Sequence, residues 1–164
     1  MTDEACPPVS VSRTIGAPAE KLFAILARPV RHPLIDGSGM VLRAPSDAVV
    51  SGVGDVFTMR MHNDEMGHYE IDNYVVEYEL NRRIGWEPVL KAASREEDQE
   101  GIGDRAEIRW IYDLEPLDSG ATLVTETYDC SRAPDWLRKA VRGGERWRAS
   151  MTLTLEKLDA LSRD

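Results

Sequence analysis

The chain contains few cysteines, an excess of acidic over basic residues and no long hydrophobic segment. Its two cysteines, Cys6 and Cys130, are too far apart for a local metal or redox motif, and we expect thiols in a reducing compartment. Lysine and arginine number 20 against 29 acidic residues, and the net charge of −9 argues against a nucleic-acid partner. No apolar run approaches the roughly 18 residues of a membrane span, and no secretory signal is visible. These absences predict a cytoplasmic protein without integral membrane association.

The common cofactor and metal motifs are also absent. The short glycine motifs at residues 37–39, 52–55 and 101–104 do not extend to the GxGxxG pattern of dinucleotide sites, and neither GxSxG nor a P-loop occurs. His62 and His68 lie six positions apart across a predicted hairpin turn, which differs from the i, i+4 spacing of a helical zinc motif. We therefore expect no cofactor and no metal.

The spacing of the apolar residues predicts the order of the elements. Residues 9–15 alternate between apolar and polar, which predicts a strand, and two short helical segments follow it. From about residue 40 to 131 the pattern is typical of antiparallel strands joined by tight turns, with an acidic, solvated loop over residues 93–104. From Pro134 to about Leu161 apolar residues recur every three or four positions, which predicts one long helix of about 40 Å. We predict an α+β fold and a single domain over residues 1–164.

Large apolar side chains are concentrated on the predicted strands and on the C-terminal helix. A strongly curved sheet cannot press its whole concave face onto one helix, so a space between them is expected. Aromatic and methionine side chains are typical of the walls of small-molecule pockets, although the same residues could fill a dry core. The residues predicted to bind a ligand are Phe57, Met59, Met61, Tyr78, Trp86, Trp110, Tyr112, Trp147, Met151 and Leu155.

Four segments resemble one known superfamily. They are VSRTIGAPAEKLFAILARPVRHPLIDGSG (residues 11–39), YVVEYELNRRIGWEP (74–88), WIYDLEPLDSGATLVTETYD (110–129) and MTLTLEKLDAL (151–161). In this order they resemble the START-like, or SRPBCC, superfamily over about residues 8–160, and within it the polyketide cyclase/dehydrase and lipid-transport branch. The resemblance implies a helix-grip fold, in which a curved seven-stranded antiparallel sheet wraps around a long C-terminal helix. It also implies two short helices after strand 1 and a deep hydrophobic cavity, but the fold carries no universal catalytic set.

The stretch RHPLIDGSGMV, residues 31–41, contains two candidate catalytic residues. His32 precedes Pro33, which favours an extended conformation that ends the helix. Asp36 begins a predicted Asx-type turn over residues 36–39, where glycines are free to adopt positive φ. A His32–Asp36 pair for proton transfer is the functional alternative. We favour the interpretation that this stretch ends a helix and frames the cavity.

Glu126 is the third candidate catalytic residue. If Val124 and Tyr128 face inward, Glu126 does too, whereas an inward Leu123 and Thr125 would leave it in solvent. A carboxyl group in an apolar pocket would have a raised pKa and could act as an acid or base. The sequence does not distinguish these two registers.

Two glycines, Gly143 and Gly144, interrupt the predicted C-terminal helix. They cost on the order of 2 kcal/mol relative to alanines, so we expect that they allow either close packing against the sheet or a kink. The basic residues around them are predicted to form a solvated helix face or, alternatively, an anchor for an anionic ligand or a membrane surface. These basic residues are Arg138, Lys139, Arg142, Arg146 and Arg148.

The sequence leaves two main functions open, besides a partner-binding or regulatory role that would show as a closed cavity and a large exposed apolar patch. The first is binding, with or without transport, of a small hydrophobic ligand such as a lipid, fatty acyl or polyketide-like compound by a monomer or homodimer. The second is an enzyme of the cyclase, aromatase or dehydratase type acting on a ligand in the same cavity. Two inward polar groups within about 3–4 Å of each other would favour the enzyme, and a purely apolar wall would favour the carrier.

Overall fold

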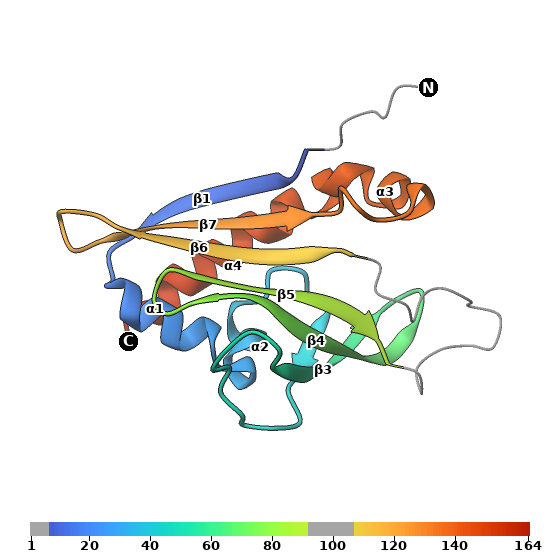
Figure 1. Cartoon of the computed structure of the whole chain (residues 1–164), viewed down its shortest axis with the longest axis horizontal. Helices are drawn as coiled ribbons and strands as arrows, with labels where there is room; N and C mark the ends of the chain where they lie inside the picture. The colour runs from blue at the N-terminus through green and yellow to red at the C-terminus, as the bar shows by residue number, and fades with distance from the viewer. Residues whose placement is uncertain (1–6, 92–106) are drawn as a thin grey trace.

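One antiparallel sheet of seven strands forms most of the molecule (Figure 1). The computed structural model describes residues 7–91 and 107–164, so Cys6 and the loop predicted over residues 93–104 lie outside the described residues. The strand order is β1-β7-β6-β5-β4-β3-β2, and every neighbouring pair is antiparallel. The strands are β1 (Val9–Ile15), β2 (Val41–Arg43), β3 (Val56–Asn63), β4 (Gly67–Glu79), β5 (Arg83–Leu90), β6 (Arg109–Pro116) and β7 (Thr122–Asp129).

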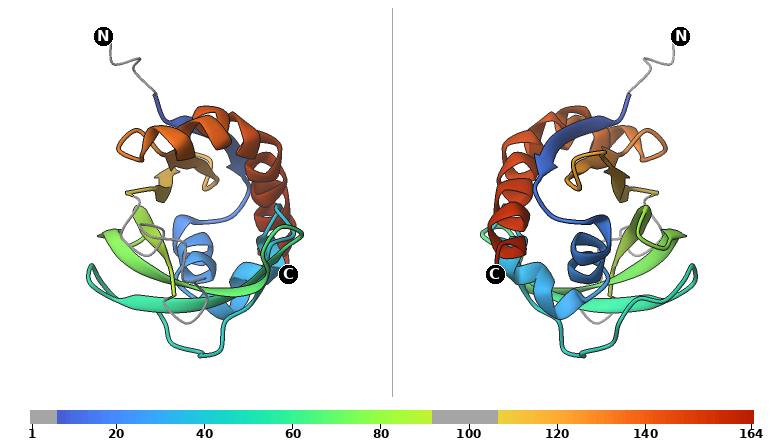
Figure 2. Two further views of the ribbon diagram at one scale, coloured as in Figure 1. Left: turned by 90° about the vertical axis from the view of Figure 1, so that its right-hand side faces the viewer. Right: turned by 90° about the vertical axis from the view of Figure 1, so that its left-hand side faces the viewer.

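Helices close the open side of the curved sheet. They are α1 (Ala19–Leu26), the 3-10 turn η1 (Pro29–Arg31), α2 (His32–Ile35), α3 (Asp135–Ala140), the 3-10 segment η3 (Arg142–Trp147) and α4 (Arg148–Ser162). Helix α4 packs on edge strand β1, and α2 packs on both α4 and the other edge strand, β2. Figure 2 shows the resulting closed outline, with α4 beside β1 and the short helices above the strongly bent β3 and β4. The predicted α+β helix-grip architecture is confirmed.

The period-two pattern of the sequence determines which side chains enter the core. In β3, Phe57, Met59 and Met61 are buried while Arg60 is exposed, as the alternation predicts. Glu126 of β7 lies on the buried face together with Val124 and Tyr128, and this settles the register that the sequence left open.

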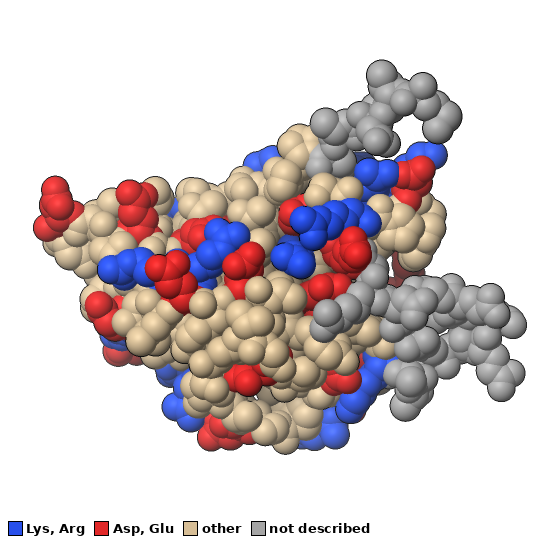
Figure 3. Space-filling view, viewed as in Figure 1, with Lys and Arg blue, Asp and Glu red and all other residues tan. Residues whose placement is uncertain are grey.

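The side of the sheet seen in Figure 3 carries acidic and basic side chains that alternate with one another. Ion pairs also join neighbouring strands of the sheet: Arg83 Nη1 lies 2.7 Å from Asp113 Oδ1, and Arg60 Nε lies 3.3 Å from Glu70 Oε1. Opposite charges directly across an antiparallel pair stabilise the strand register modestly. Among the described residues, no helix is long and apolar enough to cross a membrane.

The prediction of one continuous helix from Pro134 to Leu161 is wrong. Helix α3 ends at Ala140, and Gly143 and Gly144 then interrupt the helical backbone before α4, because their φ of 66° and 103° lie in the left-handed region. A Cβ atom on Gly144 would lie 2.8 Å from Tyr128 Cδ1 and 3.0 Å from Val9 Cγ2. The glycine pair therefore provides both of the expected effects, a break in the helix and close packing against the sheet.

The predicted extended conformation of His32 is also wrong. With φ −58° and ψ −38°, His32 is helical and begins α2, and Pro33 occupies the first turn of that helix. Proline is tolerated there because the amide groups of a first turn have no intrahelical acceptor. The Asx turn after α2 is present, since Asp36 Oδ1 accepts a hydrogen bond of 3.0 Å from the Ser38 backbone N–H.

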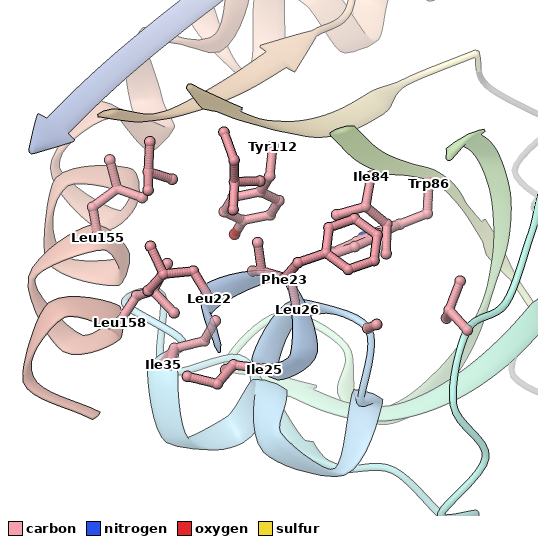
Figure 4. Close-up of a cluster of buried hydrophobic side chains, with 14 of the residues drawn as sticks. Leu22, Phe23, Ile25, Leu26, Ile35, Ile84, Trp86, Tyr112, Leu155 and Leu158 are labelled. Atoms are coloured by element: carbon pink, nitrogen blue, oxygen red, sulfur yellow. The ribbon is translucent and has the colours of Figure 1, made fainter. Parts of the chain in front are cut away.

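The packed core lies between α1, α4 and the part of the sheet opposite the α3–η3 end. Leu22 and Leu26 of α1 meet Leu155 and Leu158 of α4 in one cluster, and all four side chains are almost completely buried (Figure 4). Burying one such large apolar side chain stabilises the fold by roughly 1.5–3 kcal/mol compared with leaving it exposed to solvent. This end of the molecule is filled, and the remaining space lies at the other end.

Candidate ligand pocket

A pocket of about 320 Å³ lies between the concave face of the sheet and the helices. Its wall comes from α2 and the turn after it, from strands β2 to β7, and from α3, η3 and α4. Most lining side chains are aromatic, aliphatic or methionine, a composition typical of small-molecule sites. Its aromatic members are Phe57, Tyr69, Trp86, Trp110, Tyr112, Tyr128 and Trp147.

A buried hydrogen-bonded pair, Tyr112 and Glu126, forms part of this wall. The two residues face each other across the β6–β7 ladder, and the Tyr112 hydroxyl donates to Glu126 Oε1 over 3.1 Å. The second carboxyl oxygen, Oε2, is buried and has no hydrogen-bond partner among the described residues. Burial raises the pKa of Glu126 from 4.5 to about 8, although the bond from Tyr112 acts in the opposite direction. Burial and the adjacent carboxyl group also raise the pKa of Tyr112 well above its usual value.

His32 contributes a neutral imidazole to the same pocket. Its Nε2 lies 2.7 Å from the carbonyl oxygen of Leu26, so Nε2 carries the proton and Nδ1 is left as an acceptor. Its ring stacks on Trp86 with 5.0 Å between centroids, and Phe57 contacts it edge-on at 5.5 Å. Burial lowers the pKa of His32 from 6.5 to about 4, so the ring is uncharged near neutral pH.

Asp36 lines the pocket but is engaged by its own turn. Its Oδ1 accepts hydrogen bonds from the backbone N–H and the hydroxyl of Ser38, and its Oδ2 accepts one of 3.1 Å from the Val41 N–H. The structure gives no direct hydrogen bond between Asp36 and His32. Asp36 therefore acts on the pocket through its charge, which raises the pKa of Glu126 further.

The pocket wall contains no lysine and no arginine within the described part of the chain. The basic residues near η3 do not line the pocket: Arg138 pairs with Asp135, Arg148 Nη2 lies 2.7 Å from Glu145 Oε1, and Arg146 lies over the ring of Trp147. Trp147 itself lines the pocket, and its indole Nε1 is buried without a partner among the described residues. The predicted anionic anchor is thus not part of the pocket wall.

Comparison with known proteins gives distant sequence relatives and many structural neighbours. No family model matches the chain. The uncharacterized proteins Rv0088 and MT0096, from two Mycobacterium tuberculosis strains, are each 33% identical over 124 residues, which is 74% of this chain and 46% of theirs. The chain therefore spans about half the length of the curated relatives it matches.

The structural neighbours cover almost the whole chain. The Polyketide_cyc-like protein Cgl2372 of Corynebacterium glutamicum has a TM-score of 0.58 and 23% identity over 99% of this chain and 92% of its own. The AHSA1 protein of Silicibacter pomeroyi has 0.58 and 21% over 94% and 96%, and NE0264 of Nitrosomonas europaea has 0.67 and 16% over 99% and 98%. The chain has the START-like, or SRPBCC, fold. At these identities the likeness concerns the fold alone.

The START-like fold brings most of the predicted site residues together. His32, Asp36 and Glu126 all line the pocket, and so do eight of the ten predicted ligand-binding residues. These eight are Phe57, Met59, Met61, Trp86, Trp110, Tyr112, Trp147 and Met151.

Two predicted ligand-binding residues lie in the packed core of the START-like fold instead. Tyr78, at the far end of β4, packs edge-on against Phe23 of α1 with 5.5 Å between ring centroids. Leu155 lies one turn beyond Met151 on α4, where α1 fills the space, and it is almost fully buried. Both were assigned from residue type and face, which do not tell how far along an element the packed region extends.

Several lining residues were not predicted from the sequence. Tyr128 has the same inward register as Glu126, and Tyr69, Ile71 and Asn73 alternate along β4 toward the pocket. Strict application of the period-two rule to β4 would have found these three residues. Leu137 and Val141 fall within the apolar pattern that begins at Pro134, and they line the pocket where this segment is broken at the glycines.

Within the described residues, the START-like fold gathers no group of three or more side chains that could hold a metal. His62 and His68 pair across the β3–β4 ladder with 4.8 Å between ring centroids. A zinc site needs three or four converging ligands, so this pair by itself is not one.

Proposed function

We propose that the chain binds a small hydrophobic ligand, such as a lipid, fatty acyl or polyketide-like compound, in the pocket described above. The observation that carries the proposal is an apolar, aromatic-rich pocket of about 320 Å³ inside a START-like fold. Moving apolar ligand surface into such a wall contributes about 25 cal/mol per Å². Methionines at Met59, Met61 and Met151 adapt their shape to different apolar partners. The likeness in fold to a Polyketide_cyc-like protein agrees with this proposal.

We also propose a domain extent, a cellular location and an oligomeric state for the chain. We propose one START-like domain over residues 1–164, a cytoplasmic location and a monomeric or homodimeric state. Size-exclusion chromatography with light scattering measures the last of these directly.

Mass spectrometry of molecules released by denaturing the purified protein tests the binding proposal. We expect a stoichiometric apolar compound that is absent from a mock purification. The variant Ile71→Trp should lower the recovered amount at least about tenfold, because Ile71 lines the pocket and a larger side chain would occupy its volume. Leu42→Trp is the matched control, since Leu42 is 43% exposed and lies outside the wall. Equal recovery from both variants would argue against binding at this place.

An acid–base reaction on the same ligand is a second candidate function. It is favoured by the Tyr112–Glu126 pair, whose oxygen atoms are 3.1 Å apart inside the pocket, and by the raised pKa of Glu126 near 8. In this case Glu126 would exchange a proton with the ligand, and Tyr112 would stabilise the carboxylate that remains after proton donation.

Turnover of the released compound distinguishes catalysis from carriage. If the second candidate holds, the wild-type protein converts the compound, and Glu126→Gln slows conversion by about 100-fold or more, the usual contribution of a general acid or base. Product formation is followed by chromatography with mass detection. A compound that remains unchanged with the wild-type protein would leave binding as the function.

A further inference from the structure

The pocket lacks a counter-charge for an anionic ligand. Among the described residues its wall contains no lysine or arginine, while two of its members, Asp36 and Glu126, carry carboxyl groups. A carboxylate or phosphate moved into such a wall would lose its hydration without gaining a cationic partner. The electrostatics of the pocket therefore disfavour a ligand that buries an anionic head group.

The protonated carboxyl group of Glu126 is a hydrogen-bond donor for which no described residue provides an acceptor. The residue is only 3% exposed, and its Oε1 accepts a hydrogen bond from the Tyr112 hydroxyl. Because burial raises the pKa of Glu126 to about 8, the carboxyl group carries a proton near neutral pH, and Oε2 is the oxygen left to hold it.

Trp147 supplies a second donor. The indole N–H can only donate a hydrogen bond. It is buried, and no described residue accepts a hydrogen bond from it. The ring lies 6.4 Å from both Trp110 and Tyr128, which are also members of the pocket wall. A buried donor without an acceptor is unfavourable, so a ligand oxygen that accepts this hydrogen bond should bind more tightly.

We propose that the pocket selects an uncharged apolar ligand through acceptor oxygens, such as the carbonyl of a ketone or ester, which receive hydrogen bonds from Glu126 and Trp147. The inference rests on the proposed binding function and defines the polar part of the ligand. It separates ketones and esters from free fatty acids and from amines.

The other titratable groups of the wall leave this assignment unchanged. They are His32, Asp36, Tyr69, Tyr112 and Tyr128. His32 has a lowered pKa of about 4 and remains neutral between pH 6.5 and 9. Asp36 is engaged by backbone donors, and burial raises the pKa of Tyr69 and, far more, that of Tyr112. Above neutral pH, Glu126 is therefore the pocket group expected to change its charge.

Four probes with one carbon skeleton test the proposal: methyl naphthyl ketone and the corresponding alcohol, amine and ethyl-substituted hydrocarbon. Affinities are measured by calorimetry or by quenching of tryptophan fluorescence at pH 6.5 and 9. At pH 6.5 the ketone should bind about 3- to 10-fold more tightly than the hydrocarbon, the range expected for one net hydrogen bond. At pH 9 this preference should decrease, because ionised Glu126 no longer donates.

Variants assign the effect to the two donors. Glu126→Gln keeps an N–H donor at this position, so the ketone preference should persist at both pH values. Glu126→Leu should reduce the preference to the part that the Trp147 N–H supplies and should remove its pH dependence, while retaining hydrocarbon binding. Trp147→Phe should reduce it, whereas Trp110→Phe, in the same wall but without a buried unpartnered N–H, should not.

Three outcomes would overturn the inference. If the amine binds most tightly, and more so at pH 9, Glu126 binds a cation instead. If all four probes bind equally, the ligand class is wrong while the pocket still functions in binding. If no probe binds, including the hydrocarbon, the proposed function fails and the inference fails with it.

Discussion

Gly37→Ala should lower the free energy of unfolding by about 3 kcal/mol, more than most single substitutions in a surface turn. Gly37 follows α2 at the point where the chain passes directly over α4. A Cβ atom there would lie 2.1 Å from the Ser150 carbonyl oxygen and 2.8 Å from the Thr154 backbone nitrogen. Both atoms belong to the backbone of a helix, so the contact is relieved only if α4 and the turn move apart.

Separation of these elements would also open the pocket. The Gly37 N–H donates a hydrogen bond of 2.9 Å to Thr154 Oγ1, and Thr154 lines the pocket together with Ser150. We therefore expect weaker ligand retention in Gly37→Ala as well as lower stability. Urea unfolding followed by circular dichroism measures the second effect directly.

Gly16→Ala is the matched control for this substitution. A Cβ atom on Gly16 would meet no atom within 4 Å, and its φ lies outside the left-handed region, so its free energy of unfolding should change by less than about 0.5 kcal/mol. If Gly37→Ala proved as stable as Gly16→Ala, the close approach of the α2–β2 turn to α4 would be refuted.

Glu126→Gln should make the protein more stable than wild type above neutral pH, by an amount that grows with pH. The pKa of Glu126 is about 8 in the folded protein against an ordinary value of 4.5. The native state therefore holds a proton that the unfolded chain has released. The stability from this group is complete below pH 4.5 and is lost as the pH rises through 8.

His32 sets the pH window for the measurement, because its effect on stability changes with pH in the opposite direction to that of Glu126. Its pKa is about 4 in the folded protein against 6.5, so its contribution is complete above pH 6.5 and is lost as the pH falls through 4. Between pH 6.5 and 8 the effect of Glu126 is free of this contribution. Since each pKa unit corresponds to about 1.4 kcal/mol, the wild-type protein should lose about 2 kcal/mol relative to Glu126→Gln over this window.

Urea unfolding of both proteins at several pH values measures this difference. Glu115→Gln is the control: Glu115 lies exposed on β6, and its substitution should leave the pH profile of the wild type unchanged. Parallel profiles for wild type and Glu126→Gln would mean that Glu126 is ionised in the native state, and the donor role proposed for it would then be lost.

The local rules of the chain determined the elements and much of the character of the pocket. Alternation placed Phe57, Met59 and Met61 on one face of a strand, because successive side chains in a strand point to opposite sides. The Asx turn at Asp36 followed from a short polar side chain beside glycines, a preference that acts within a few residues. Large aromatic side chains on the strands and the last helical segment already indicated a site for an apolar molecule.

Tertiary structure decided which of these residues meet. From the sequence, either face of β7 could have been the buried one. Glu126 enters the pocket because pairing with Tyr112 of β6 sets the register. His32 became a buried neutral base because it begins α2 against the Leu26 carbonyl instead of ending a helix. The long apolar stripe after Pro134 is broken at Gly143 and Gly144, since Tyr128 and Val9 leave no room for a side chain on Gly144. Each of these outcomes depends on contacts between residues distant in the chain, which periodicity and local propensity do not encode.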